Sequence, residues 1–292
     1  MTDSVGIAVV DKLPGWTSHQ VVGRCRRILG TRKVGHAGTL DPMATGVLVI
    51  GVNRATRLLG HLMLTEKEYA ATIRLGITTV TDDAEGDLTG APGAAGLEEP
   101  AVRAAIPAFT GDILQIPTAV SAIKVDGKRA YARVRAGEDV TLQSRPVTVH
   151  AFDLHEVRPG MAEGVHVLDC DVTVRCSSGT YIRALARDLG ARLGTGGHLT
   201  ALRRTRVGPF GLDRAHVVDA DSDALPLLSL DDVVPECFDT LEVDERAAAA
   251  IRYGQRLPGV PLSGLTALLD RGRFLALYRP DGQDAVPEAV FV

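Results

Sequence analysis

Hydrophobic positions along the chain follow strand and helix periods in turn. Residues 6–11 and 46–51 are short apolar runs, which are typical of buried strands. Residues 67–75 and 168–176 alternate apolar and polar side chains, as strands with one buried face do. The pattern predicts helices in four further stretches: 18–29, 53–64, 100–112 and 182–190.

Local signals sharpen some of these boundaries. Thr17 and Gln20 form a capping box before the first helix, and Gly30 is placed to end it. Gly190 is expected to end the helix that starts at Ile182. The pair Asp126-Gly127 predicts a hairpin turn.

The last third of the chain differs from the rest in composition and in predicted elements. Residues 219–236 are rich in Pro and Asp and are interpreted as a linker or docking segment. A short helix over 244–253 and two strands, 265–269 and 274–278, are predicted after it.

Composition places the chain among globular proteins. It has 292 residues, 45% hydrophobic and 23% charged, enough for one large domain and a small one. We find no secretory signal and no apolar run long enough to span a membrane, so a cytoplasmic location is expected. The four cysteines form no C-x-x-C pair, so neither a zinc site nor a disulfide framework is expected.

Charge is distributed unevenly. The formal net charge is −4, yet residues 24–33 carry five bases and no acid, and residues 124–135 carry five bases against Asp126. Since binding depends on the local field, both clusters suit a nucleic-acid partner. A solvated helix face explains either cluster equally well.

The most informative stretch is 35–51, where a glycine-punctuated loop carrying a single carboxylate, Asp41, precedes an apolar run. Gly35 and Gly38 allow close backbone approach, and Pro42 keeps Asp41 out of a helix. A lone acid displayed from a stiff loop suits a nucleophile or general base. An isolated Asp-Pro, however, is usually a turn with a solvated carboxylate.

The wording of this loop, GHAGTLDPMATGVL, resembles the central motif of the TruB family of tRNA pseudouridine synthases, which modify uridine 55 in the T loop of tRNA. The resemblance covers most of residues 6–212 and implies that Asp41 is catalytic. A tyrosine that opens a strand before R-L-G matches Tyr69, which would stack on the target base. G-T-Y-I-R-x-L matches the motif whose arginine, here Arg183, pairs with the catalytic aspartate. Outside this context Tyr69 would be interpreted as a core residue and Arg183 as a surface residue.

The resemblance also implies a set of substrate contacts. K-x-x-G-x-T-S, from Lys12, is similar to the opening motif, and His36 is a candidate to fill the stack that a flipped base vacates. A turn histidine with a satisfied hydrogen bond remains the other interpretation of His36. The basic insertion, about 124–146, is expected to close over the RNA. The predicted substrate-binding residues are His36, Tyr181, Leu202, Lys12, Arg57, Lys124, Arg129 and Arg133.

The fold implied is α+β, a mixed, mostly antiparallel β-sheet core flanked by helices, with a small β-rich PUA-like domain at the C-terminus. The domains expected are 1–235, catalytic, and 236–292. The reaction needs no cofactor and no metal, and the partner is the T stem-loop of tRNA, with no membrane and no obligate protein partner. Two alternatives stay open: a non-catalytic tRNA-binding or folding chaperone, and an N-glycosidase, because a carboxylate at an anomeric carbon also suits hydrolysis.

Overall fold

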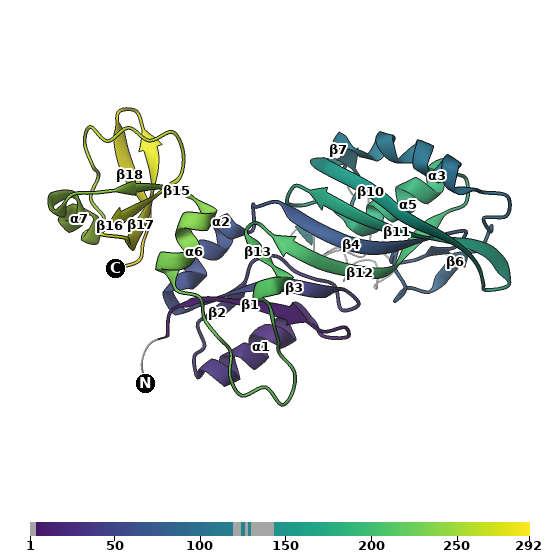
Figure 1. Ribbon diagram of the computed structural model, residues 1–292, viewed down its shortest axis with the longest axis horizontal. Helices are drawn as coiled ribbons and strands as arrows, with labels where there is room; N and C mark the ends of the chain where they lie inside the picture. The colour runs from purple at the N-terminus through teal and green to yellow at the C-terminus, as the bar shows by residue number, and fades with distance from the viewer. Residues whose placement is uncertain (1–3, 119–123, 126–127, 130–142) are drawn as a thin grey trace. The chain divides into compact units, whose positions relative to one another are not determined.

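The computed structural model describes residues 4–118, 124–125, 128–129 and 143–292 (Figure 1). The chain divides into two compact units. Unit 1 comprises Met1–Asp41, Gly46–Met63 and Val207–Val292, and unit 2 comprises Pro42–Thr45 and Leu64–Arg206. Each unit is described by itself.

Unit 1 begins with a strand, a capped helix and a buried strand. Its elements are β1 (Gly6–Lys12), α1 (Ser18–Leu29), β2 (Val34–His36), β3 (Thr45–Val52), η1 (Asn53–Leu58), α2 (Leu59–Leu62), β13 (Phe210–Gly211), η3 (Leu212–Arg214), β14 (His216–Val217), α6 (Leu230–Cys237), β15 (Asp239–Glu242), α7 (Glu245–Arg252), β16 (Thr266–Asp270), β17 (Arg273–Asp281) and β18 (Asp284–Val290). The predicted capping box is confirmed, because Gln20 N–H donates to Thr17 Oγ1 and the Gln20 side chain accepts from Thr17. Gly30 ends α1 in the left-handed conformation, with φ of 62°, also as predicted.

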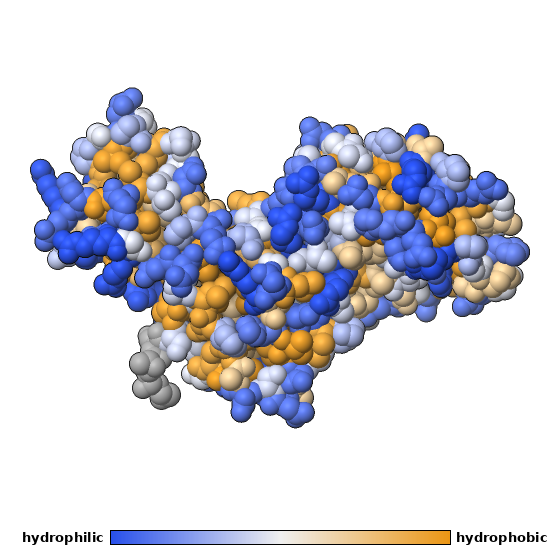
Figure 2. All heavy atoms as spheres, viewed as in Figure 1, coloured by the Kyte–Doolittle hydropathy of each residue, from blue (hydrophilic) through white to orange (hydrophobic). Residues whose placement is uncertain are grey.

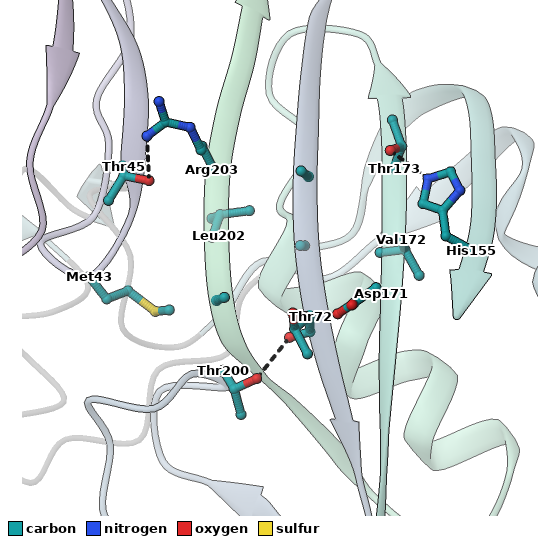
Figure 3. A pocket seen from close by; sticks show the side chains of 13 residues that line it. Met43, Thr45, Thr72, His155, Asp171, Val172, Thr173, Thr200, Leu202 and Arg203 are labelled. Carbon is teal, nitrogen blue, oxygen red and sulfur yellow. Dashed lines mark hydrogen bonds between the residues drawn. The ribbon is translucent and has the colours of Figure 1, made fainter. Parts of the chain in front are cut away.

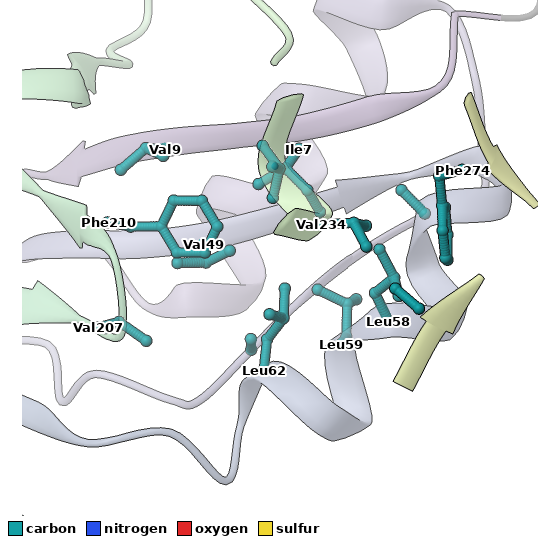
Figure 4. Close-up of a cluster of buried hydrophobic side chains, with 14 of the residues drawn as sticks. Ile7, Val9, Val49, Leu58, Leu59, Leu62, Val207, Phe210, Val234 and Phe274 are labelled. Atoms are coloured by element: carbon teal, nitrogen blue, oxygen red, sulfur yellow. The ribbon is translucent and has the colours of Figure 1, made fainter. Parts of the chain in front are cut away.

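The first sheet of unit 1 runs in the order β14-β1-β3, with β2 also paired to β3. β1 pairs antiparallel with β3 and parallel with β14. The segment 53–64, predicted as one helix, starts as the 3₁₀ helix η1 and becomes α-helical only in the short α2. Its buried leucines, Leu58, Leu59 and Leu62, pack with Ile7, Val49 and other core residues (Figure 4).

The C-terminal sheet runs in the order β15-β16-β17-β18, parallel between β15 and β16 and antiparallel elsewhere. The predicted helix and two strands of this region are confirmed as α7, β16 and β17. Asp244 caps α7 by accepting from Ala247 N–H, and hydrophilic side chains cover the outer side of this helix (Figure 2). One face of the sheet packs on α7, whereas Phe274 and Phe291 join the core that contains β1 and β3.

Unit 2 is built on a second run of strands, in the order β12-β4-β11-β10-β7. Its elements are β4 (Lys67–Leu75), β5 (Thr78–Thr79), β6 (Leu88–Gly90), α3 (Glu99–Ala105), η2 (Ile106–Phe109), β7 (Gly111–Gln115), β8 (Lys124–Val125), β9 (Lys128–Arg129), β10 (Arg145–Ala162), β11 (Val165–Cys176), α5 (Ile182–Arg192) and β12 (Gly197–Val207). The alternation predicted for β4 and β11 is confirmed, since buried and partly exposed residues follow each other along both strands. β8 pairs antiparallel with β9 on either side of residues 126–127, as the predicted hairpin requires.

Two boundary predictions in unit 2 are wrong. The helix predicted over 100–112 ends at Phe109, and β7 begins at Gly111, whose φ of 90° favours glycine. Gly190 does not end its helix, because α5 continues to Arg192. A Cβ at Gly190 would lie 2.2 Å from the carbonyl carbon of Gly196, so this glycine instead lets the chain entering β12 pack against the helix.

The fold class is confirmed as α+β with mixed, mostly antiparallel sheets flanked by helices. All four cysteines are free thiols. No helix among the described residues is long and apolar enough to cross a membrane. In the same part of the chain, no group of three or more His, Cys, Asp or Glu side chains is placed to hold a metal ion.

Candidate active site

The loop that carries Asp41 runs from β2 to β3 and is fixed at its centre by α1. Ser18, the first residue of α1, is buried; its hydroxyl donates to the carbonyl of Leu40 at 3.1 Å and accepts from Leu40 N–H at 2.9 Å. Gly38 has a φ of 98°, as the unusual backbone of this loop requires. Asp41, half-buried, therefore follows a residue whose backbone is held on both sides.

Lys12 supports the other side of the same helix start. Its side chain is 1% exposed, and its ammonium donates to the carbonyls of Leu13 at 3.0 Å and Trp16 at 2.7 Å. These bonds close the turn that precedes α1. His36 lies edge-on to His19, a residue of α1, with ring centroids 5.7 Å apart.

In unit 2, Tyr69 lies on the buried face of β4, where it is 8% exposed and opposite Val174 of β11. Lys67 is on the same face and donates to the carbonyl of Thr65 at 2.9 Å. Burial, with the nearby charge of Arg204 added to it, lowers the pKa of Lys67 from 10.5 to about 8. The tyrosine thus shares its strand face with a cation that loses its proton easily.

Arg183, in the first turn of α5, is buried, which its place off the apolar stripe did not predict. Its guanidinium Nη1 donates to the carbonyl of Thr81 at 3.0 Å and to Asp83 Oδ2 at 3.2 Å. The side chains of this ion pair are 7% and 3% exposed. Asp83, the buried partner of Arg183, is absent from the site residues that the sequence predicted. The available signal was the loop Thr81–Gly86, whose sequence resembles a T-D-x-x-D/E-G motif of the same synthase family.

Asp83 is itself tied into that loop. It accepts from Thr81 Oγ1 and from Glu85 N–H, and Leu199 N–H donates to the carbonyl of Asp82 at 3.0 Å. Asp82 faces Arg187, with Nη1 and Oδ2 3.4 Å apart, and burial raises the pKa of this carboxyl. Two arginines of α5 therefore anchor the 81–83 loop.

Tyr181, which precedes α5, is held through its backbone. The buried amide of Gln115 accepts from Tyr181 N–H at 2.8 Å and donates to its carbonyl at 2.9 Å. Arg187 also donates to the carbonyl of Ile116 at 2.8 Å. The end of β7 is thus fastened to the N-terminal half of α5.

Leu202 lies in the wall of a pocket of about 520 Å³ in unit 2 (Figure 3). Thr45, at the start of β3, accepts from Arg203 Nη1 at 3.3 Å on one side of the pocket. On the other side Thr72 donates to Asp171 at 2.7 Å. Hydrogen bonds from Arg158 lower the pKa of Asp171, so this carboxylate stays ionised and paired with the Arg158 guanidinium.

The remaining predicted contacts lie on other parts of the chain. Arg57, exposed on η1, donates through Nη1 to the carbonyl of Val290 in β18 at 2.6 Å. Lys124 and Arg129 are paired across the β8–β9 hairpin. Arg133 lies outside the described residues.

Comparison with known protein families agrees with the resemblance that the motifs indicate. Residues 26–182 match the sequence model of the TruB family pseudouridylate synthase (N terminal domain). The chain belongs to the TruB family. Residues 183–225 match the tRNA pseudouridylate synthase B C-terminal domain, and residues 238–292 match the C-terminal domain of tRNA pseudouridine synthase II.

Relatives within the TruB family are similar over nearly the whole chain. The tRNA pseudouridine synthase B of Arthrobacter sp. (strain FB24) is 57% identical over 277 residues, 95% of this chain and 90% of that protein. That of Streptomyces griseus subsp. griseus is 54% identical over 289 residues, 98% of this chain and 97% of the relative.

Solved structures give the same fold. A chain in the crystal structure of a Cbf5-Nop10-Gar1 complex matches with a TM-score of 0.71 and 27% identity. The match covers 98% of the present chain and 85% of the chain in the complex. An H/ACA RNP bound to a substrate RNA containing 2'-deoxyuridine matches with a TM-score of 0.69 and 26% identity, over 98% and 85% of the two chains. Membership of the TruB family, implied by the motif wording, is thereby confirmed. The roles of the individual site residues stay predictions.

Proposed function

We propose that this chain isomerises uridine to pseudouridine at position 55 in the T loop of tRNA. Family membership and relatives named tRNA pseudouridine synthase B, at 57% and 54% identity, support the reaction class. The observation that carries the proposal for this chain is Asp41, displayed directly after a residue whose backbone Ser18 holds from both sides.

The chemistry uses few protein groups. The N1–C1′ bond of uridine breaks, the base turns, C1′ bonds to C5, and the proton from C5 is lost while N1 gains one. Asp41 attacks C1′, attacks C6 of the base, or removes a proton to give a glycal-type intermediate. The residues themselves leave these three routes open.

Two residues of unit 2 support Asp41 in this proposal. The ring of Tyr69 stacks on the flipped base and assists removal of the C5 proton. Arg183 keeps Asp41 ionised, because a nearby cation favours the charged form of a carboxyl. Asp83 fixes the Arg183 guanidinium, since both side chains are almost fully buried and hydrogen-bonded.

RNA contacts complete the proposal. His36 braces the vacated stack, and Tyr181 and Leu202 line the base pocket. Arg57 belongs to the substrate surface, and Lys12, which is buried, supports that surface through the turn that it closes before α1. The insertion at 124–146, with Lys124, Arg129 and Arg133, binds phosphates of the T arm. Residues 1–235 form the catalytic domain and 236–292 the PUA-like domain. The free cysteines fit a reducing compartment, and we place the enzyme in the cytoplasm with its tRNA substrate.

The test is Asp41→Asn, assayed on unmodified tRNA transcript, with Asp239→Asn as the control because Asp239 is an exposed carboxylate of β15. The Asp41 variant should lose single-turnover pseudouridine formation while the tRNA dissociation constant stays within a few-fold, since the residue acts on the target nucleotide and does not hold the RNA backbone. The control should keep both. Conversion by Asp41→Asn near the wild-type rate would contradict the assignment. Wild-type protein that binds tRNA without converting it would point to the chaperone function instead.

A further inference from the structure

The charge of the N-terminal half of unit 1 is almost entirely positive. Between residues 13 and 65 the only acid is Asp41, against seven lysines and arginines. Most arginines in unit 2 and in the C-terminal sheet pair with carboxylates, as Arg74 does with Asp169 and Arg256 with Asp281 and Asp284. The N-terminal lysines and arginines lack such nearby carboxylates in the sequence, so their role requires a separate explanation.

Five of them gather around the end of α1 and the start of η1. Arg26 donates to the carbonyl of Val34 at 3.0 Å. The loop that follows α1 is fastened to η1, because Asn53 N–H donates to the carbonyl of Lys33 at 2.7 Å and Thr31 donates to Asn53 Oδ1 at 2.8 Å. We call the exposed set the α1–η1 basic patch: Arg26, Arg27, Arg32, Lys33 and Arg54.

The patch has no anionic partner among the described residues: none of its five side chains forms an ion pair there. Arg24 is excluded from it, because its guanidinium donates to the carbonyls of Asp219 and Ser222. The dipole of α1 favours cations in the last turn, which accounts for Arg26 and Arg27. It does not account for Arg32, Lys33 and Arg54, which lie outside the helix.

The end of the patch that Lys33 and Arg54 form is also far from the Asp41 loop. Lys33 and Arg54 lie beyond Val52 at the end of β3, whose other end, Thr45, adjoins that loop. An eight-residue strand is roughly 25 Å long, so Lys33 and Arg54 cannot reach the nucleotide that Asp41 is proposed to modify. A partner that touches Asp41 and this end of the patch must be an extended polyanion.

We propose that the α1–η1 basic patch binds phosphates of the substrate RNA remote from the target uridine. This inference rests on the proposed function, which makes the RNA a tRNA. Exposed lysines and arginines on the helix end, loop and 3₁₀ turn suit a phosphate backbone, which such side chains recognise without base specificity. The patch positions the RNA and takes no part in the chemistry.

The experiment compares two triple variants of unit 1 with unmodified full-length tRNA. Arg27→Gln, Arg32→Gln and Arg54→Gln remove three patch charges that make no hydrogen bond among the described residues. Arg252→Gln, Arg256→Gln and Arg279→Gln remove three charges that pair with acids of the C-terminal sheet, Asp270, Asp281 and Glu288. Both triples change the net charge equally.

Each phosphate contact contributes about 0.7–0.9 to the slope of log affinity against log salt, so the patch triple should lower this slope by about 2. Its tRNA dissociation constant at about 0.1 M salt should rise at least tenfold, and a higher RNA concentration should overcome the defect. A slope equal to wild type, or an equal loss in the control triple, would overturn the proposal. If wild-type protein forms no pseudouridine, the proposed function fails; if it does and the patch slope is unchanged, only the patch assignment fails.

Discussion

Replacing Asp83 by Asn tests the buried ion pair that holds Arg183. The change keeps the size of the side chain and one acceptor for Glu85 N–H, but it removes the charge that faces Arg183. Because the two side chains are 3% and 7% exposed, water cannot replace the lost carboxylate. Removing one partner of such a pair costs about 3–5 kcal/mol of unfolding free energy, and we expect the lower end because Asn still accepts hydrogen bonds.

The matched control is Asp169→Asn. Its partner Arg74 makes two bonds, at 2.8 and 2.7 Å, which are shorter than the 3.2 Å between Arg183 and Asp83. The Arg74 and Asp169 side chains are, however, 28% and 22% exposed. Ion pairs that water reaches contribute about 1 kcal/mol or less. Asp169→Asn should therefore lose less stability than Asp83→Asn, although the hydrogen bonds of Asp169 are shorter.

Both variants are measured by chemical denaturation and by single-turnover pseudouridine formation. We expect Asp83→Asn to lose about 3 kcal/mol and to slow conversion roughly 100-fold, as displacement of a catalytic group by an ångström does. Asp169→Asn should stay near wild type in both. If Asp83→Asn loses no more stability than Asp169→Asn, burial does not set the strength of the ion pair between Arg183 and Asp83.

Three further predictions concern unit 2. The first compares wild type with Lys67→Met: the unfolding free energy of wild type, relative to that of the variant, should rise by roughly 2–3 kcal/mol between about pH 7 and 10. The reason is that the unfolded chain keeps the Lys67 proton to higher pH than the folded chain does. A difference that does not change with pH would contradict the lowered pKa of Lys67. Gln115→Leu should cost about 1–3 kcal/mol by denaturation, because it leaves the Tyr181 N–H and carbonyl without their partner; Gln115→Glu should be no more stable at neutral pH, because its buried carboxylate cannot donate to that carbonyl. Gly190→Ala should cost at least about 1 kcal/mol, since its methyl would meet the Gly196 backbone; an unchanged melting temperature would show that the chain entering β12 can move.

Much of the fold could be predicted because local signals coincide with burial. The capping box at Thr17, the alternation of β4 and the αL glycine at residue 30 each depend on neighbours within a few residues. β7 was not predicted because its side chains do not follow the pattern of a core strand. Leu114 is 72% exposed to solvent, whereas the polar Gln115 is buried. Gln115 is inside because of its bonds to Tyr181, a residue 66 positions away, and no window of sequence contains that information.

The candidate site shows the same limit. Gly190 has the spacing of a helix end, but its role is set by the backbone of Gly196, which meets it only after the chain turns. Arg183 was identified by its motif, whereas its burial and its bond to Asp83 depend on the 81–83 loop reaching α5. The motif therefore indicated Arg183 as a candidate site residue, whereas only the tertiary contacts show that Asp83 holds its guanidinium in place.

Product mapping on a single unmodified tRNA transcript tests directly whether this chain converts uridine 55 to pseudouridine. Wild-type protein is incubated with the RNA, the mass of the RNA and the release of free uracil are measured, and pseudouridine is located by chemical labelling and primer extension. We expect pseudouridine at position 55, an unchanged RNA mass and no free uracil. Free uracil would indicate an N-glycosidase, and an RNA that is bound but left unmodified at position 55 would contradict the proposed function.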